Sequence, residues 1–329
     1  MYSYTIVQWF FFFYFYCFVG WCIESTYVSI KTKQLTNRGF MRGPFLPLYG
    51  SGAIMKLVVS MPFQDNIFMV YVAGCIGATI LEYVTGVTME ALFKVRYWDY
   101  SNNKFNFQGH ICLGTSLSWG FLTILMTEVV HVPVERFVLS IPDMVLKVVT
   151  YVLSVVIFAD FALSFKAAID LRDVLVKMEQ VKEEMVHIQK RLDVMIALAN
   201  QEVENRKSVL SESMNMAREE LVESMSMRIE DIKSGIEKKM EQVKAIIPSR
   251  DGTRMDGAMD NVQEELQDLK TKYAINVADR NRLGRLKDFF QRDLVRSNPS
   301  MTSVRFREAL EELKGRTMGR DDTDDEKKA

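Results

Sequence analysis

Acidic side chains inside apolar stretches are the first residues of this sequence that could do chemistry. Glu24, Glu82 and Glu90 each lie in a long apolar segment, and Asp160 lies near the end of another. A charged group in the hydrocarbon of a membrane is costly, so it usually faces a partner charge or a polar cavity. Two interpretations follow: a pocket or pathway for a polar solute, or ion pairs between helices. We favour the pocket for Glu24 and Glu82 taken together.

The elements that carry these acids are five apolar segments of membrane-spanning length. A hydrocarbon core about 30 Å thick takes roughly 20 residues of helix. We therefore predict an all-α fold whose residues 1–165 form a five-helix transmembrane domain, with spans at about 4–30, 45–61, 67–93, 111–130 and 145–165.

The distribution of positive charge predicts the orientation of these spans. Ten Lys and Arg residues precede Phe165, and seven of them follow the first and third predicted spans: Lys31, Lys33, Arg38, Arg42, Lys94, Arg96 and Lys104. Loops rich in Lys and Arg stay in the cytoplasm. We expect a multi-pass protein of the cell membrane with its N-terminus outside and its C-terminal tail in the cytoplasm.

One face of the third predicted span carries small residues and carboxylates. Positions four apart lie on the same face of a helix, and this face has Gly74, Ala78, Glu82, Gly86 and Glu90. Small residues at that spacing allow another helix to approach closely. This face is therefore a helix–helix contact first, and a functional site if a cavity opens beside it.

The start of the second predicted span is crowded with prolines and glycines: Pro44, Pro47, Gly50 and Gly52. Irregular backbone at membrane depth is tolerated where it is buried in protein or lines a watery cavity, and interrupted helices often mark transporter sites. The alternative is a plain junction between loop and helix at the membrane surface.

Several short motifs in this half of the chain resemble those of the type IV ABC-transporter permeases, a family of bacterial multi-pass proteins. They run in order over about residues 10–135 and leave the tail outside the resemblance. The motifs are Gly20-Trp21 with Glu24-Ser25, Asn37-Arg38-Gly39-Phe40 with Gly43-Pro44, Pro47-Leu48-Tyr49-Gly50, Leu81-Glu82-Tyr83, Trp98-Asp99-Tyr100-Ser101 and Asn106-Phe107-Gln108-Gly109.

The resemblance implies a permease-like protein and a common site at the motif positions. Together with Glu90, the candidate pathway or pocket residues are Glu24, Arg38, Glu82, Trp98, Asp99 and Asn106. The chain has no G-x-x-x-x-G-K-[ST] phosphate loop, so we expect a separate ATPase subunit to supply any energy from ATP. We also expect no enzymatic activity, no cofactor, no catalytic residue and no metal site.

The tail beyond residue 165 predicts a long cytoplasmic coiled coil. Apolar residues alternate at spacings of four and three, which indicates a heptad seam: Val174, Met178, Val181, Met185, Ile188, Leu192, Met195 and Ala199. We predict one helix over 166–247, a second over 258–297 and a mostly disordered tail over 298–329. The sequence leaves open whether the second helix folds back, and the exposed seam favours self-association or partner binding.

Two functions remain open from the sequence. The first is a permease-like protein that forms or gates a pathway for a small solute. The second is a membrane-anchored scaffold or sensor whose coiled coil recruits partners. The stretch 270–307 is rich in Lys and Arg, which suits anionic lipid or an acidic protein. A nucleic acid is the least favoured partner because no known binding module frames the stretch.

Overall fold

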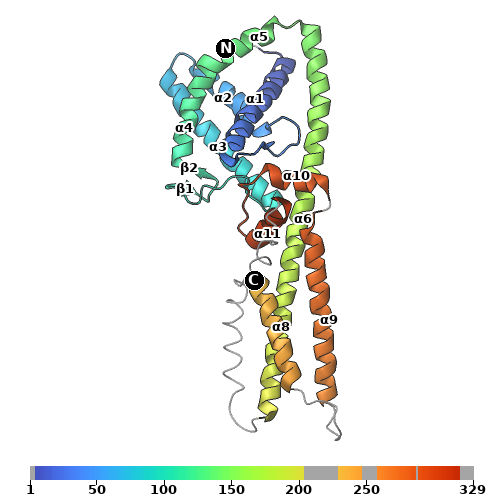
Figure 1. Ribbon diagram of the computed structural model, residues 1–329. Coiled ribbons are helices and arrows are strands. Elements are labelled where there is room, and N and C mark those ends of the chain that lie inside the picture. The colour runs from blue at the N-terminus through green and yellow to red at the C-terminus, as the bar shows by residue number, and fades with distance from the viewer. Residues whose placement is uncertain (1–3, 204–228, 247–257, 287, 319–329) are drawn as a thin grey trace. The chain divides into compact units, whose positions relative to one another are not determined.

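A computed structural model describes residues 4–203, 229–246, 258–286 and 288–318 of the chain. The chain divides into two compact units (Figure 1). The first, here called the membrane unit, comprises Met1–Asp173 and Leu286–Ala329; the second, called the helical unit, comprises Val174–Arg285. The helical unit is therefore inserted into the sequence of the membrane unit.

The membrane unit is almost entirely helical. Its elements, in chain order, are α1 (Ile6–Thr32), α2 (Pro47–Ser60), the 3-10 turn η1 (Met61–Phe63), α3 (Ile67–Phe93), the short antiparallel strands β1 (Asn106–Phe107) and β2 (Ile111–Cys112), α4 (Leu113–Ile124), the π-helical turn η2 (Leu125–Val130), α5 (His131–Ser140), the first part of α6 (Asp143–Val203), α10 (Phe289–Ser297) and α11 (Arg307–Met318).

Four helices in the described part of the chain are long and apolar enough to cross a membrane. They are α1, α3, the continuous helix Leu113–Ser140 and the apolar part of α6. The all-α class and a multi-pass membrane protein are thus supported. The predicted count of five spans is not confirmed, because α2 has 14 residues and is about 21 Å long, less than the thickness of a hydrocarbon core.

Helix α2 is short because it starts deep beside α1. The backbone N–H of Leu46 donates to the carbonyl of Cys17, in the middle of α1, at 3.0 Å. Pro47 then occupies the first turn of α2, where its missing N–H is not needed. Further along, Leu57 packs with Phe12 in one buried cluster, so α2 runs antiparallel to α1. The irregular segment before α2 therefore packs against α1 and is half-buried over Gly43–Leu46.

The ends of α1 and α3 follow from local sequence. Thr5 and Gln8 form a capping box at the start of α1, and the side chain of Asn66 accepts hydrogen bonds from the backbone at the start of α3. Both helices end at a lysine in the left-handed conformation, Lys33 and Lys94. This reverses the chain into the two loops that carry most of the positive charge.

The helical unit packs three helices around one apolar core (Figure 1): the second part of α6, α8 (Ile229–Ile246) and α9 (Ala258–Gly284). The predicted seam residues Met185, Ile188, Leu192 and Met195 are buried in this core with Ile232 and Leu269, among others. The second helix therefore folds back within the chain. The seam thus packs against helices of its own chain. A coiled coil between two chains stays a prediction, and so does the cytoplasmic location of the helical unit.

The C-terminal region differs from the prediction at two points. Residues 258–297 form two helices, α9 and α10, instead of one. Residues 298–318, predicted to be disordered, are folded: Met301, Phe306, Leu310 and Leu313 are buried. Four apolar residues among many polar ones gave too weak a pattern to predict this. The end of the tail predicted to be disordered, residues 319–329, lies outside the described residues.

Candidate functional site

A cavity of about 260 Å³ lies between α1, α2, α3 and the α4–η2 helix. Most of its wall is apolar, and the polar side chains that line it include Tyr16, Tyr49, Lys56, Glu82 and Trp119. The helices around it approach closely at glycines. A Cβ on Gly77 would be 3.1 Å from Val59 of α2, and the predicted small-residue face of α3 is buried at Gly74, Ala78, Glu82 and Gly86.

Glu82 is the buried acid of this cavity. Its carboxylate accepts one hydrogen bond from the Tyr100 hydroxyl and one from Trp119 Nε1, both at 3.0 Å. Burial and the nearby carboxylate raise the pKa of the Tyr100 hydroxyl, which keeps it a donor. Each oxygen of Glu82 therefore has one strong donor. Glu82 lines the cavity, and its role as a pathway or pocket residue stays a prediction.

Lys56 lies over the ring of the same residue, Trp119. Its Nζ lies 4.6 Å from the centre of the Trp119 ring, a distance that allows a cation–π interaction. The residue is only 9% exposed, and no described residue forms an ion pair or hydrogen bond with its amino group. Trp119 thus contacts the buried Lys56 amine through its ring face and the Glu82 carboxylate through Nε1. The sequence contains Lys56 in plain view, but nothing in it pairs that lysine with Trp119.

Glu24 lies next to the cavity. The Tyr49 hydroxyl, which belongs to a cavity-lining residue, donates to Glu24 at 2.9 Å. The other oxygen of Glu24 lies 3.5 Å from Arg38 Nε in an ion pair. Glu24 therefore pairs with an arginine of the loop that follows α1 and borders the cavity through Tyr49.

The remaining candidates lie together on a separate surface, here called the loop face, formed by residues 33–46 and 94–112. Glu90 contacts Arg96 at 2.9 Å and His110 at 3.0 Å. Burial and Arg96 lower the pKa of His110, and they outweigh the Glu90 carboxylate, which raises it. The neutral ring then donates its Nε2 hydrogen to Glu90.

Trp98, Asp99 and Asn106 hold the second loop in shape. Trp98 Nε1 donates to the carbonyl of His110 at 3.0 Å. Asn106 donates to two backbone carbonyls of the loop and accepts from the N–H of Gly109. Burial disfavours the charge on Asp99, but hydrogen bonds from Ser101 and the guanidinium of Arg96 outweigh it and lower its pKa. These motif residues are structural, and none lines the cavity.

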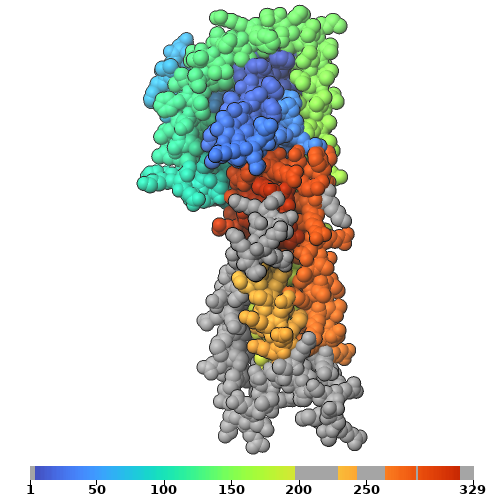
Figure 2. Space-filling view, in the orientation of Figure 1, coloured from blue at the N-terminus to red at the C-terminus, as the bar shows by residue number. Residues whose placement is uncertain are grey.

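Residues 288–318, here called the C-terminal segment, cover the loop face (Figure 2). The sequence did not predict this contact. Arg38 donates to the Asn298 side chain at 2.9 Å and to Ser300 at 3.0 Å. Asn298, itself 1% exposed, donates back to the carbonyl of Gly39 at 2.9 Å. Thr302 pairs with Arg96 through backbone hydrogen bonds in both directions. The motif arginine thus anchors residues of the same chain.

Arg42 binds the same segment by charge and by aromatic contact. Its Nε lies 3.3 Å from Asp293, and its guanidinium carbon lies 4.6 Å and 4.5 Å from the ring centres of Phe289 and Phe290. Arg42 thus joins this segment to the loop face.

The predicted basic stretch 270–307 is not exposed throughout. Its Arg280 is 1% exposed and donates to the carbonyl of Met178 inside the helical unit.

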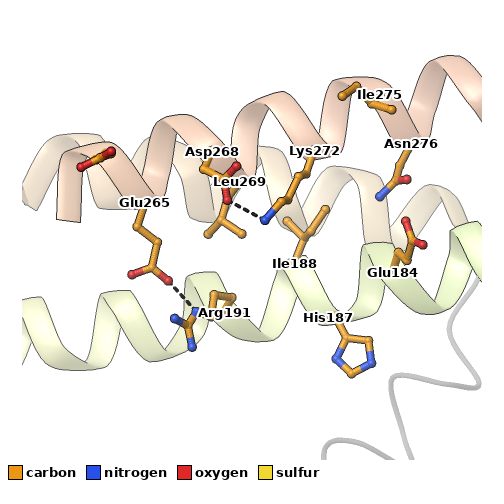
Figure 3. A pocket seen from close by; sticks show the side chains of 11 residues that line it. Glu184, His187, Ile188, Arg191, Glu265, Asp268, Leu269, Lys272, Ile275 and Asn276 are labelled. Atoms are coloured by element: carbon orange, nitrogen blue, oxygen red, sulfur yellow. Dashed lines mark hydrogen bonds and ion pairs between the residues drawn. The ribbon is translucent and has the colours of Figure 1, made fainter. Parts of the chain in front are cut away.

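A second hollow, in the helical unit, is an open groove between α6 and α9 (Figure 3). Its volume is about 950 Å³. Charged residues along it pair with each other: Arg191 with Glu265, and Lys272 with Asp268 at 2.6 Å. Exposed pairs of this kind contribute little energy, and this groove is open and lies outside the apolar helices. We therefore place the functional site in the cavity of the membrane unit.

Comparison with known proteins supports the resemblance seen in the motifs. Residues 11–165 match the model of the family described as "Putative ABC-transporter type IV". No curated protein and no solved structure matches the chain. The matched residues include α1, the cavity and the loop face, and end within α6, before the helical unit. Residues 11–165 of this chain thus match that ABC-transporter family.

Proposed function

We propose that this chain is a permease-like component that binds a small solute in the cavity of the membrane unit and forms or gates a pathway for it. The observation that carries the proposal is a cavity among apolar helices that holds a buried lysine and a buried glutamate. Ionisable residues at such depth usually mark a solute or ion pathway.

The cavity wall favours one class of solute. Both oxygens of Glu82 accept hydrogen bonds from the protein, whereas Lys56 has only the Trp119 ring beside its amino group. An acidic group on the solute would complete the surroundings of Lys56, and the apolar wall would receive an apolar body. The proposed substrate is therefore a small amphipathic anion.

Two further parts of the proposal concern its surroundings. Because the chain has no phosphate loop, a separate ATPase subunit would drive transport. Because Lys and Arg concentrate in the two loops of the loop face, that face would lie in the cytoplasm, with the N-terminus outside. Purification of the full-length protein from its own membrane in mild detergent tests the first point: a stoichiometric ATPase is expected to accompany it.

Thiol labelling tests the pathway without knowledge of the solute. All four native cysteines are replaced, and Gly52→Cys is introduced, because Gly52 lines the cavity and has open space at its Cβ position. We expect a water-soluble anionic methanethiosulfonate to label it at least about tenfold faster than a cationic one of similar size, since a one-charge contact at reduced dielectric exceeds 1.4 kcal/mol. Lys56→Met should remove that preference.

The control is Phe121→Cys, whose native side chain is 67% exposed on the apolar outer face of α4. Charged reagents should not reach it in an intact membrane. If Gly52→Cys also stays unlabelled while the purified, unfolded protein reacts, water and solutes do not enter the cavity, and the proposed pathway is excluded.

The scaffold or sensor alternative rests on the long coiled coil of the tail, which was to recruit partners. In the structure the seam of that coil is buried against α8 and α9 of the same chain, which gives this alternative less support.

A further inference from the structure

His131 lies at the centre of a hydrogen-bonded chain that the sequence analysis did not anticipate. The ring is completely buried. Its Nδ1 lies 2.9 Å from the Tyr16 hydroxyl, and its Nε2 lies 3.0 Å from the Tyr4 hydroxyl. The Tyr4 hydroxyl also contacts the carboxylate of Glu135. Four titratable groups, one in α1, one two residues before α1 and two in α5, are thus connected in series.

The chain has a defined direction. A carboxylate oxygen can only accept, so the Tyr4 hydroxyl donates to Glu135. Its oxygen must then accept from His131 Nε2, which leaves Nδ1 without a hydrogen. Nδ1 therefore accepts from the Tyr16 hydroxyl. Each group donates to the next, from Tyr16 to Glu135, which is the arrangement that relays protons.

The two ends of the chain open to different surroundings. Tyr16 lines the cavity, whereas Glu135 is partly exposed and belongs to α5, at the end of the unit where Ser140 leads into α6. Of the two groups between these ends, His131 is fully buried and Tyr4 is half-buried. The buried imidazole therefore lies between the cavity end and the partly exposed Tyr4 and Glu135.

The local backbone adds an independent observation. The π-helical turn Leu125–Val130 ends immediately before His131. A π turn inserts one extra residue per turn and changes which side chains face inward, and such turns are common at functional sites. Beyond the turn, His131 faces Phe12 and the two tyrosines of the relay, with ring centres 5.0 to 6.2 Å apart.

We propose that Tyr16, His131, Tyr4 and Glu135 conduct protons between the cavity and the end of the membrane unit opposite the loop face. A proton that binds the Tyr16 oxygen from the cavity releases the hydroxyl proton to Nδ1. The resulting imidazolium releases its Nε2 proton to the Tyr4 oxygen, and Tyr4 releases its own proton to the Glu135 carboxylate. One O–H or N–H bond forms for each that breaks, and one proton is moved. Rotation of the hydroxyls and a flip of the imidazole ring reset the chain for the next proton.

This inference goes beyond the proposed solute site, since protons could move whether or not a solute binds. Its test uses the full-length protein in liposomes that contain the pH dye pyranine. A potassium gradient with valinomycin makes the interior negative and drives protons inward. We expect internal acidification clearly faster than in protein-free liposomes. Tyr16→Phe and Glu135→Gln should each reduce the excess rate at least about tenfold.

The matched control is Tyr14→Phe. Tyr14 lies two residues from Tyr16 in the same helix, is 7% exposed, and donates to Ser154 outside the relay. This variant should conduct within about twofold of the wild type. Three results would overturn the proposal: wild-type rates equal to those of protein-free liposomes, equal losses in Tyr14→Phe and Tyr16→Phe, or full conduction by a folded Tyr16→Phe. Thermal unfolding of each variant establishes that it is folded, and thiol labelling of the cavity separates this result from the fate of the solute site.

Discussion

Two glycines of α2, Gly50 and Gly52, provide a sharp test of how α2 packs against α1. A Cβ on Gly50 would lie 2.7 Å from the backbone carbonyl oxygen of Phe13, whereas one on Gly52 would meet nothing within 4 Å. The backbone of α1 cannot move aside as a flexible side chain could. Overpacking of this kind costs about 1–3 kcal/mol. Gly52→Ala, by contrast, should gain up to about 1 kcal/mol from the better helix propensity of alanine.

The expected difference in unfolding free energy between Gly50→Ala and Gly52→Ala is therefore about 1–4 kcal/mol. For a domain of 150 to 250 residues this corresponds to roughly 2–16 °C in Tm. Thermal unfolding of the two purified variants and the wild type in one detergent measures it. Equal Tm values for the two variants, or a more stable Gly50→Ala, would show that α2 does not approach α1 as described.

Three other predictions concern other parts of the chain. Arg38→Gln should loosen the C-terminal segment, because Asn298 and Ser300 lose the hydrogen bonds from the guanidinium, and limited proteolysis of the segment should become about tenfold faster for a loss of about 1.4 kcal/mol. Leu192→Ala, in the core of the helical unit, should lower the unfolding free energy of that unit by about 2–5 kcal/mol, whereas Val194→Ala, exposed on the same helix, should change it by less than about 0.5 kcal/mol. Because the folded state lowers the pKa of His110 below 6.5, stability from this residue is complete above pH 6.5 and is lost as the pH falls from there through the lowered pKa; a stability profile of wild type against His110→Gln tests this, and identical slopes would contradict it.

The sequence predicted the elements of the membrane unit better than the contacts between them. Hydropathy predicted the four long apolar helices of the described residues, because a helix that crosses a membrane needs about 20 consecutive apolar residues. The four-residue spacing of Gly74, Ala78 and Glu82 identified the buried face of α3. The length of α2 was overestimated, since apolar composition continues through the loop that precedes Pro47 and does not show where the helix begins.

The site was only half predictable for a related reason. Costly charges such as Glu82 are visible in a sequence, but their partners come from other helices. Lys56, Trp119 and His131 acquire their meaning from neighbours that hydropathy cannot identify. Likewise, a heptad pattern reveals which face of α6 is buried and not which helix buries it. Arg38 and Asp99 belong to the motifs that the sequence analysis identified. In the structure they support the loop face and do not line the cavity.

The contact between Arg38 and Asn298 joins residues 260 positions apart. Chains are synthesised at about 5–20 residues per second, so roughly 13–52 s pass between the synthesis of these two residues. During that interval the first loop has emerged while its covering segment does not yet exist. The helices can therefore insert into the membrane before the C-terminal segment covers the loop face. A cell that surveys new membrane proteins for uncovered surface would meet this one in an exposed intermediate every time it is made.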